Sequence, residues 1–342
     1  MDQQVPTFHE AATDWFEARR IEEGREGRGL SPSADAGLRW QLEVHPLPTF
    51  ARIRLDAIGA EDVDRWRQAK VREGRIHASS INTCLRTLSA ILEQAVEYGH
   101  LARNPAKGRR RRLPAGRPKR TYIDRAEFIA ALLDAAGELD REGRVQAYRR
   151  PLLAVMTLGG LRIDEALRLC WQPIDLARGT LKVPGTKTAA ADRSVILLPL
   201  LRDELAAHAA SRSDRTPHAL VFGTSTGHKQ SPTNVRRRVL AKAVERANIQ
   251  LALRDVGPLP EGLTPHSLRR TFASLLYARG EAPPFVMAQM GHTSPGLALA
   301  IYAREMDRRD GEPERLRALL DGADWVTTGT EASDAVANGS LE

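Results

Sequence analysis

The stretch TPHSLRRTFASLLYARGEAPPFVMAQMGHTSPGLALAIYAR, which spans Thr264–Arg304, decides how the rest of the chain is interpreted. It sets His266, Arg269, His292 and Tyr302 into a sequence that is otherwise apolar and helix-forming. These side chains suit chemistry on a phosphate, because a guanidinium can hold its charge, an imidazole can move a proton and a phenol can attack phosphorus. The sequence shows no cluster of acidic metal ligands beside them. The stretch therefore favours metal-free phosphate chemistry.

Taken one at a time, these residues have ordinary structural explanations. His266 and Arg269 lie three positions apart at the start of a predicted helix, where they share a face and where the helix N-terminus favours an anion. A histidine that caps the helix and an arginine paired with a carboxylate would give the same pattern. Tyr302 lies in an apolar helical pattern that is also typical of core packing, and a lone His292 in a loop carries little information. The four residues gain meaning only together with others.

Two residues upstream fit the same chemistry. Arg162 follows Gly159–Gly160, and such small residues allow a ligand to approach the backbone closely. Glu165, one helical turn further on, can hold the guanidinium in place. An ion pair of this kind on a helix surface is worth little by itself, so the pair indicates a site only in combination with the other residues.

The charge balance favours a polyanionic partner. The chain of 342 residues has 51 Lys and Arg against 43 Asp and Glu, a formal net charge of +8 and a pI near 9.8. Arginine suits bidentate contacts to phosphate better than lysine does. Charge alone does not establish nucleic-acid binding, because many proteins carry a solvated basic face. With only 5% aromatic residues, no cofactor site lined by stacked rings is expected, and no cofactor is predicted.

Cysteine content and hydropathy indicate the compartment. The two cysteines, Cys84 and Cys170, make neither a disulfide framework nor a zinc site, which fits a reducing environment. Acidic residues near the N-terminus exclude the apolar core of a signal peptide. No segment reaches the roughly 18 apolar residues that a membrane-spanning helix needs. The sequence therefore predicts a cytoplasmic protein without membrane contact.

The apolar periodicity predicts a mainly α protein of the α+β class. Residues 1–106 contain amphipathic segments, among them 8–24 and 36–44, and are expected to form a small helical domain. Ser79 and Ser80 are expected to cap its last helix.

A second, larger domain is expected over residues 121–320. Asp124 is predicted to cap its first helix. The clearest strand signal is the pair Leu181–Val183 and Arg193–Leu197, which flank a turn with Lys187 near its tip and predict a β-hairpin.

Two charged segments flank this second domain. Residues 107–120 hold eight basic residues, no acid and two prolines, and such a run repels itself, so an unpacked linker is predicted. The linker can serve as a solubilising hinge or as a strap that binds DNA phosphates through counterion release. Residues 321–342 carry five acids and no Lys or Arg, which predicts a disordered tail. The basic residues of the linker are Lys107, Arg109, Arg110, Arg111, Arg112, Arg117, Lys119 and Arg120.

In chain order, the motif GLRIDEAL, a lysine-bearing hairpin, the motif HSLRRTFAS and the motif MGHTSPGLALAIYAR resemble the tyrosine recombinase (phage integrase) family. The resemblance covers about residues 8–320 and is strongest around Arg162 and from His266 to Tyr302. It implies two domains that close on DNA as a C-shaped clamp. These are a helical, SAM-like core-binding domain (1–106), joined by the basic interdomain linker (107–120) to a catalytic domain (121–320).

The resemblance also implies how the reaction runs. Arg162 and Arg269 would grip the scissile phosphate and stabilise its five-coordinate transition state. Tyr302 would attack phosphorus, which forms a 3′-phosphotyrosine link and releases a 5′-hydroxyl. Lys187 would protonate that leaving oxygen. Because the turn after Lys187 departs from the family's usual pattern, Lys182 is kept as the alternative general acid.

The remaining residues of the implied site support these three steps. His266 would act as general acid and base near the tyrosine, and His292 would hydrogen-bond the phosphate. Glu165 matches the acidic position that supports the arginine and the histidine. The reaction exchanges one phosphodiester for a phosphotyrosine ester, so neither a metal nor ATP is required.

The function predicted in this way is that of a site-specific DNA recombinase, an integrase that works as a homotetramer on duplex DNA with an accessory directionality protein. A chromosome-dimer-resolution-type recombinase is the alternative role, and a type IB topoisomerase is nearest in chemistry. A catalytically silent DNA-binding regulator is the alternative of another class, although a silent site has no reason to keep all six catalytic-type residues. The first helix is predicted to begin near residue 8, so no arm-binding domain is expected within this sequence. A set of apolar residues near the C-terminus is expected to dock on a neighbouring subunit: Leu316, Leu319, Leu320 and Trp325.

Overall fold

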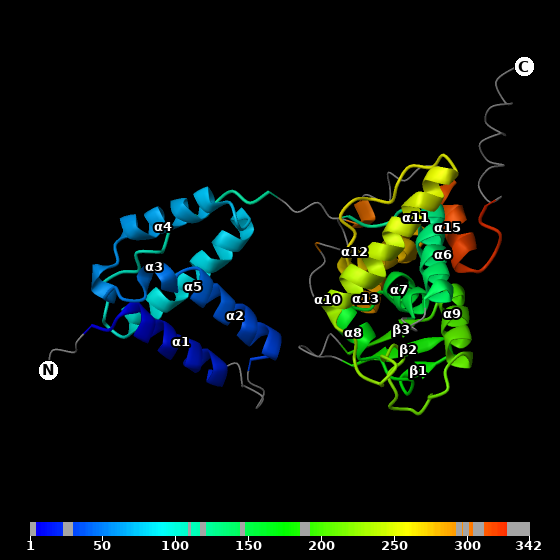
Figure 1. Ribbon diagram of the computed structural model, residues 1–342, viewed down its shortest axis with the longest axis horizontal. Coiled ribbons are helices and arrows are strands. Elements are labelled where there is room, and N and C mark those ends of the chain that lie inside the picture. The colour runs from blue at the N-terminus through cyan, green and yellow to red at the C-terminus, as the bar shows by residue number, and fades with distance from the viewer. Residues whose placement is uncertain are drawn as a thin grey trace, which may run out of the picture. The chain divides into compact units, whose positions relative to one another are not determined.

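The computed structural model describes residues 5–22, 30–108, 111–116, 121–143, 148–184, 192–291, 296, 301–303 and 311–326. The chain divides into two compact units, residues 1–118 and 119–342. Both units are mainly helical, and the second also contains a three-stranded sheet (Figure 1). The predicted fold class is therefore confirmed. No helix in these described ranges has both the length and the apolar character needed to cross a bilayer.

The first unit packs short helices around one apolar core. Its longest helix, α5, buries a stripe that includes Leu88, Ile91 and Leu92, as the three- and four-residue spacing predicts. Phe8 of α1 and Phe50 of α3 meet edge to face, with 5.8 Å between ring centroids. The helices of this unit are α1 (Phe8–Glu22), α2 (Pro32–Val44), α3 (Leu47–Phe50), a 3₁₀ turn (Leu55–Ala57), α4 (Ala60–Glu73) and α5 (Ala78–Glu97).

Two helices of this unit begin earlier than predicted. Ser79 and Ser80 lie inside the first turn of α5 and do not cap it, because the helix already starts after His77. Helix α2 starts at Pro32, since proline fits the first helical position and the preceding Ser31 supplies the cap.

The first part of the basic linker packs on this unit, so the prediction that the whole linker stays unpacked is wrong. Leu113 contacts the apolar core, and its backbone exchanges hydrogen bonds of 2.8 and 2.9 Å with the side chain of Asn82 on α5. Arg111 donates to the Lys107 carbonyl at 2.6 Å and lies 3.6 Å from the Asp64 carboxylate. The acid on α4 offsets the self-repulsion of the linker. The remaining basic residues of the linker that fall outside the described residues are Arg109, Arg110, Arg117, Lys119 and Arg120.

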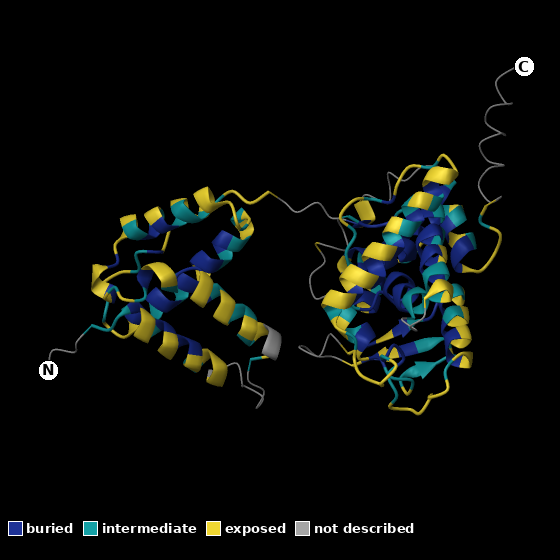
Figure 2. Cartoon of the chain, in the orientation of Figure 1, coloured by how far each residue is buried: buried dark blue, intermediate teal, exposed yellow. Residues whose placement is uncertain are grey.

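The second unit is built on two almost fully buried helices, α7 and α12. Every residue of Leu152–Leu158 on α7 is buried, and Figure 2 shows this helix as buried. Helix α7 packs against α12 and α6, and α6 packs against α11. The helices of this unit are α6 (Ala126–Glu142), α7 (Arg149–Leu158), α8 (Ile163–Leu167), α9 (Pro199–Ala210), α10 (Pro232–Asn234), a π-helix (Val235–Leu240), α11 (Ala241–Leu253), α12 (Pro265–Ala278), α13 (Pro283–Met290) and α15 (Glu312–Leu320).

The predicted hairpin is present and gains a third strand. Strands β1 (Ile174–Asp175), β2 (Thr180–Val183) and β3 (Arg193–Ile196) form an antiparallel sheet in the order β1-β2-β3. Leu181 pairs with Val195 in the β2–β3 register, and both are buried. Strand β1 was not predicted, because a strand of two residues is too short to show an alternation of apolar and polar side chains. The turn with Lys187 lies outside the described residues.

The start of α6 differs from the prediction in an informative way. Asp124 does not cap this helix, which follows Arg125 and begins at Ala126. The amide of Ala126 donates instead to the carboxylate of Glu312, 2.7 Å away on α15. A cap supplied from a distant helix cannot be found in the local sequence.

Helix α15 and the residues after it belong to the core of their own unit. Leu316, Leu319 and Leu320 are buried there, so they are not available to dock on another subunit. Trp325 packs against the same core, and the Arg315 guanidinium lies 5.4 Å from its ring centroid. The prediction of a disordered tail is thus wrong for residues 321–326, and residues 327–342 lie outside the described residues.

Candidate active site

A glycine holds the loop that carries Arg162. Gly160 follows α7 with φ of +61°, a left-handed conformation, and a Cβ at this position would lie 2.2 Å from Cδ1 of Phe272. Only glycine meets both conditions. The close contact brings the loop onto α12, and Arg162 then precedes the first residue of the short helix α8.

Arg269 is buried beneath this loop. It is fully inaccessible on α12, and its guanidinium donates to the carbonyl oxygens of Gly160 and Met290. The nearest carboxylate oxygen, on Glu165, is 3.9 Å away. Burial, and then the positive charges of Arg162 and Arg193, lower the pKa of Arg269 to about 9. The group is still a cation at neutral pH, and an incoming anion would offset its desolvation.

Glu165 is the carboxylate, among the described residues, that organises the arginines. Its side chain is 8% exposed and accepts from Arg162 Nη1 at 2.7 Å and from the Arg162 amide at 2.8 Å. Arg193 donates Nη2 to Oε2 at 2.8 Å and Nη1 to Oε1 at 3.2 Å. Burial by itself would raise the pKa of Glu165, but the hydrogen bonds from Arg193 and Arg162 lower it to about 2.

Arg193 is a site residue that the sequence analysis treated only as part of a strand. Its side chain is 4% exposed, and its Nε donates to the Gln289 carbonyl at 2.9 Å. Gln289 in turn bonds the β3 backbone, accepting from the Ile196 amide at 2.9 Å and donating to the Ser194 carbonyl at 3.2 Å. The alternation of β3, in which Arg193 and Val195 both face inward, was the available signal.

Three guanidinium groups therefore surround one carboxylate, an excess of two positive charges. Arg193 is fully engaged, whereas Arg162 is 40% exposed and, among the described residues, makes only a long contact of 3.4 Å to the Gly291 carbonyl beyond its pairing with Glu165. Arg162 is accordingly the arginine that can reach a ligand from solvent. Such a concentration of fixed positive charge suits a phosphate.

His266 lies at the solvent-exposed N-terminal end of α12, the helix that carries Arg269. Thr264, and not His266, caps α12, since its hydroxyl accepts from the Ser267 amide at 3.2 Å. His266 is exposed in the first turn. Partial burial, and then the charges of Arg270 and Arg269, lower its pKa. A neutral imidazole that can accept a proton is the result at neutral pH.

Tyr302 is the last site residue that the structure places. It lies on a helical turn, residues 301–303, and is 38% exposed, while its neighbour Ile301 is buried. Its ring lies edge to face against Tyr277 of α12, with 5.2 Å between ring centroids.

The structure thus brings together three of the predicted site residues, Arg162, Glu165 and Arg269. Arg193 joins this group, and the positions of some other predicted site residues are not described. Lys187 and His292 lie outside the described residues. Lys182 is exposed at the middle of β2, between two buried residues, and so points away from the core. In the part of the chain that the structure describes, no three His, Cys, Asp or Glu side chains gather as a metal site would require.

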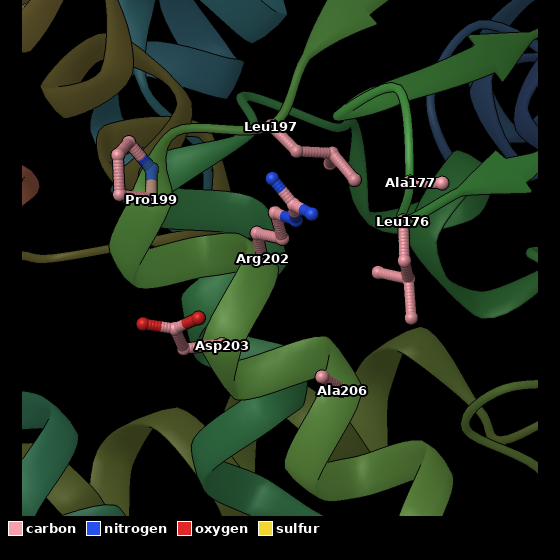
Figure 3. Close-up of a pocket in the computed structure, with 7 residues that line it drawn as sticks. All are labelled: Leu176, Ala177, Leu197, Pro199, Arg202, Asp203 and Ala206. Atoms are coloured by element: carbon pink, nitrogen blue, oxygen red, sulfur yellow. The ribbon is translucent and has the colours of Figure 1, made fainter.

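A surface hollow of about 480 Å³ beside β1 and α9 contains none of the predicted site residues (Figure 3). Arg202 points into it from α9, opposite Leu176. The hollow is lined by Leu176, Ala177, Leu197, Pro199, Arg202, Asp203 and Ala206.

Comparisons with known proteins agree with this arrangement. The sequence model described as the Phage integrase family matches residues 125–309. The chain is 28% identical over 294 residues to an integrase of Streptomyces ambofaciens, covering 77% of this chain and 69% of that protein. It is 27% identical over 276 residues to the tyrosine recombinase XerC of Pelobacter propionicus, covering 78% and 83%.

Solved structures show the same fold at low identity. The Tn1549 transposon integrase in complex with a circular intermediate DNA has a TM-score of 0.70 and 16% identity, covering 88% of this chain and 99% of that one. The lambda integrase tetramer bound to a Holliday junction has a TM-score of 0.66 and 18% identity, covering 90% and 80%.

Proposed function

Because this chain belongs to the phage integrase family, whose sequence model covers more than half of its length, we propose that it is a tyrosine site-specific recombinase that cuts and rejoins duplex DNA. The observation that carries the proposal is the group of three guanidiniums around Glu165, with Arg269 buried and Arg162 open to solvent. A scissile phosphate between these two arginines would receive the excess positive charge that its transition state needs.

The roles of the residues follow from this charge. Arg162 and Arg269 hold the phosphate while the Tyr302 oxygen forms a bond to phosphorus and the bond to the 5′ oxygen of the next nucleotide breaks. His266, neutral because of its lowered pKa, takes the proton of the phenol. Lys187 gives a proton to the leaving 5′ oxygen. The product is a 3′-phosphotyrosine link, and attack by a 5′-hydroxyl reverses every step.

Two further assignments complete this site. His292 donates a hydrogen bond to the phosphate. Arg193 holds Glu165 and does not touch DNA, because its guanidinium is fully used inside the protein. No bond energy is lost in the exchange of one phosphoester for another, so the cycle consumes no nucleotide.

A row of arginines on the second unit is suited to hold the duplex. Arg236, Arg237 and Arg238 lie on the exposed side of the π-helix, and among the described residues none of them has a hydrogen-bond or ion-pair partner. This helix follows α10, which packs against α8 beside Arg162 (Figure 1). Phosphates of DNA next to the scissile one would supply the missing partners.

Fewer residues of the basic linker are available to bind DNA than its charge suggests. Arg111 is engaged in the first unit, whereas Arg112 is exposed. We infer that Arg112 and the linker residues beyond the described ranges, rather than the whole run, contact DNA as a strap.

The setting of the reaction follows from the same proposal. The chain acts in the cytoplasm as a homotetramer on DNA, with each active site cutting one strand, and serves a mobile element whose direction of recombination is set by an accessory protein. A tetramer matches the number of strands in two paired duplexes.

Trapping of the covalent intermediate tests this function. The substrate is a duplex from the junctions flanking the gene, nicked so that the released 5′-hydroxyl fragment diffuses away. We expect wild-type protein to form a DNA adduct that survives a denaturing gel and forms in the presence of EDTA. Tyr302→Phe should bind the same DNA and give no adduct. An adduct from the phenylalanine variant would refute the assignment of the nucleophile.

A further inference from the structure

The nucleophile proposed above rests against a second tyrosine. The rings of Tyr302 and Tyr277 cross at 63° with 5.2 Å between their centroids, which is the favourable edge-to-face geometry of aromatic pairs. Tyr277 is 8% exposed, so its ring is a fixed part of the core, while Tyr302 is 38% exposed. The contact therefore joins a rigid ring to a half-open one.

The rigid ring belongs to the helix that carries the phosphate-binding arginine. Tyr277 follows Arg269 by eight positions on α12, which places their Cα atoms about 12 Å apart along the helix axis. A helix buried on nearly all sides keeps that spacing constant. A residue that packs against Tyr277, as Tyr302 does, is therefore held at a defined position along α12 relative to Arg269.

The residue before the nucleophile is anchored next to this contact. Ile301 is 3% exposed and packs in the core of the second unit. The Tyr302 side chain can turn among staggered rotamers. The ring of Tyr277 limits that rotation.

We propose that Tyr277 is a positioning residue, which holds the Tyr302 ring at a set distance from Arg269 and so prepares the phenol for attack. This inference rests on the proposed function, because it assigns a guide to the nucleophile of that reaction. Tyr277 itself takes no part in proton transfer. Burial, and then the neighbouring Tyr302, raise its pKa to about 12, so it stays an uncharged ring at neutral pH.

The size of the effect follows from the strength of a ring pair. An aromatic pair contributes about 0.5 to 1.5 kcal/mol beyond its buried area, and the same free energy lost from the reactive arrangement lowers a rate about two- to twelvefold. Tyr277→Leu removes the ring and keeps an apolar side chain. Tyr277→Phe keeps the ring and removes only the hydroxyl.

The first experiment measures the contact without DNA. The chain has five tyrosines, so protein labelled with 3-fluorotyrosine gives five ¹⁹F resonances, and Tyr302→Phe identifies the one from the nucleophile. We expect the Tyr302 resonance to keep its position in Tyr277→Phe and to move in Tyr277→Leu towards that of the exposed Tyr98. A resonance that does not move in the leucine variant overturns the contact and the proposal with it.

The second experiment measures adduct formation at saturating nicked DNA. We expect Tyr277→Leu to form the adduct about fivefold more slowly with unchanged DNA affinity, and Tyr277→Phe to retain the wild-type rate. Ile129→Val, a buried change on α6, is the control for lost stability, and thermal unfolding confirms that each variant folds. A leucine variant as fast as wild type or faster, or a phenylalanine variant as slow as leucine, overturns the proposal.

The two experiments separate the possible failures. If wild-type protein forms no adduct on DNA that it binds, the recombinase assignment fails and the role of Tyr277 as guide fails with it, while the ¹⁹F spectra still decide whether the ring contact exists. If the adduct forms and only the leucine variant is slow, the recombinase assignment and the positioning role of Tyr277 are both supported.

Discussion

Two groups of three arginines in the second unit are built in opposite ways. Arg162, Arg193 and Arg269 converge on Glu165, and two of the three are buried. The arginines of the π-helix, Arg236–Arg238, are exposed and have no partner among the described residues. The free-energy cost of desolvating the first group is incurred during folding, whereas the guanidiniums of the second group remain hydrated. The difference indicates that the first group stabilises charge during the reaction, while the second gains affinity from DNA.

The sharpest test removes Arg269, the fully buried arginine of the first group. Arg269→Ala should slow adduct formation by about 10² to 10³, the usual loss for one preorganised donor, with much less change in DNA affinity. Single-turnover trapping and a filter-binding titration measure the two quantities. Arg202→Ala, on the exposed surface hollow, serves as control. If Arg269→Ala lost affinity in the same proportion as rate, the contrast between the two groups would disappear.

The next test concerns the carboxylate that assembles the first group. The pKa of Glu165 is about 2 in the folded chain against 4.5 ordinarily, so its ionised form stabilises the fold above pH 4.5 by about 3 kcal/mol and this contribution is lost as the pH falls towards 2. We expect Glu165→Gln to lower the free energy of unfolding by about this amount at pH 7.

Urea unfolding as a function of pH measures this effect. The difference between wild type and Glu165→Gln should narrow as the pH falls below 4.5. Asp203→Asn, which changes an exposed carboxylate on α9, serves as the control. A constant difference across the range would mean that Glu165 is not the ion that holds the arginines.

The smallest effect is expected from the exposed group. Replacing Arg236, Arg237 and Arg238 by glutamine should weaken DNA binding and lower the slope of log affinity against log salt concentration by about 2 to 3, since each phosphate contact contributes about 0.9. The rate of adduct formation at saturating DNA should change far less than the affinity. An unchanged salt slope would place these arginines away from DNA.

The sequence predicted site residues correctly where each of them occurs in a recognisable short motif. Arg162, Glu165 and Arg269 occur in short motifs, and the structure brings them together. Arg193 could not be found in that way, because its task depends on a partner 28 positions earlier in the chain. An inward-facing arginine on a strand has meaning only once the opposite carboxylate is known.

The fold shows the same limit. Long amphipathic patterns predicted helices such as α1, which was expected over residues 8–24 and is found over Phe8–Glu22. The cap of α6 and the packing of Leu113 on Asn82 were missed, because in each case the partner is far away in the sequence. Local composition predicted repulsion in the linker, and a single acid, Asp64, changed the outcome.

The contact between Glu312 and the first turn of α6 has a consequence for how the protein is made. The amide of Ala126 belongs to the first residue of the first helix of the second unit, and its acceptor belongs to the last described helix. That unit can complete its core only after nearly the whole chain has left the ribosome. The first unit, with a core of its own, can fold while synthesis continues. A chain cut off by premature termination just past Tyr302 would carry the nucleophile but lack the helix that closes the core around it.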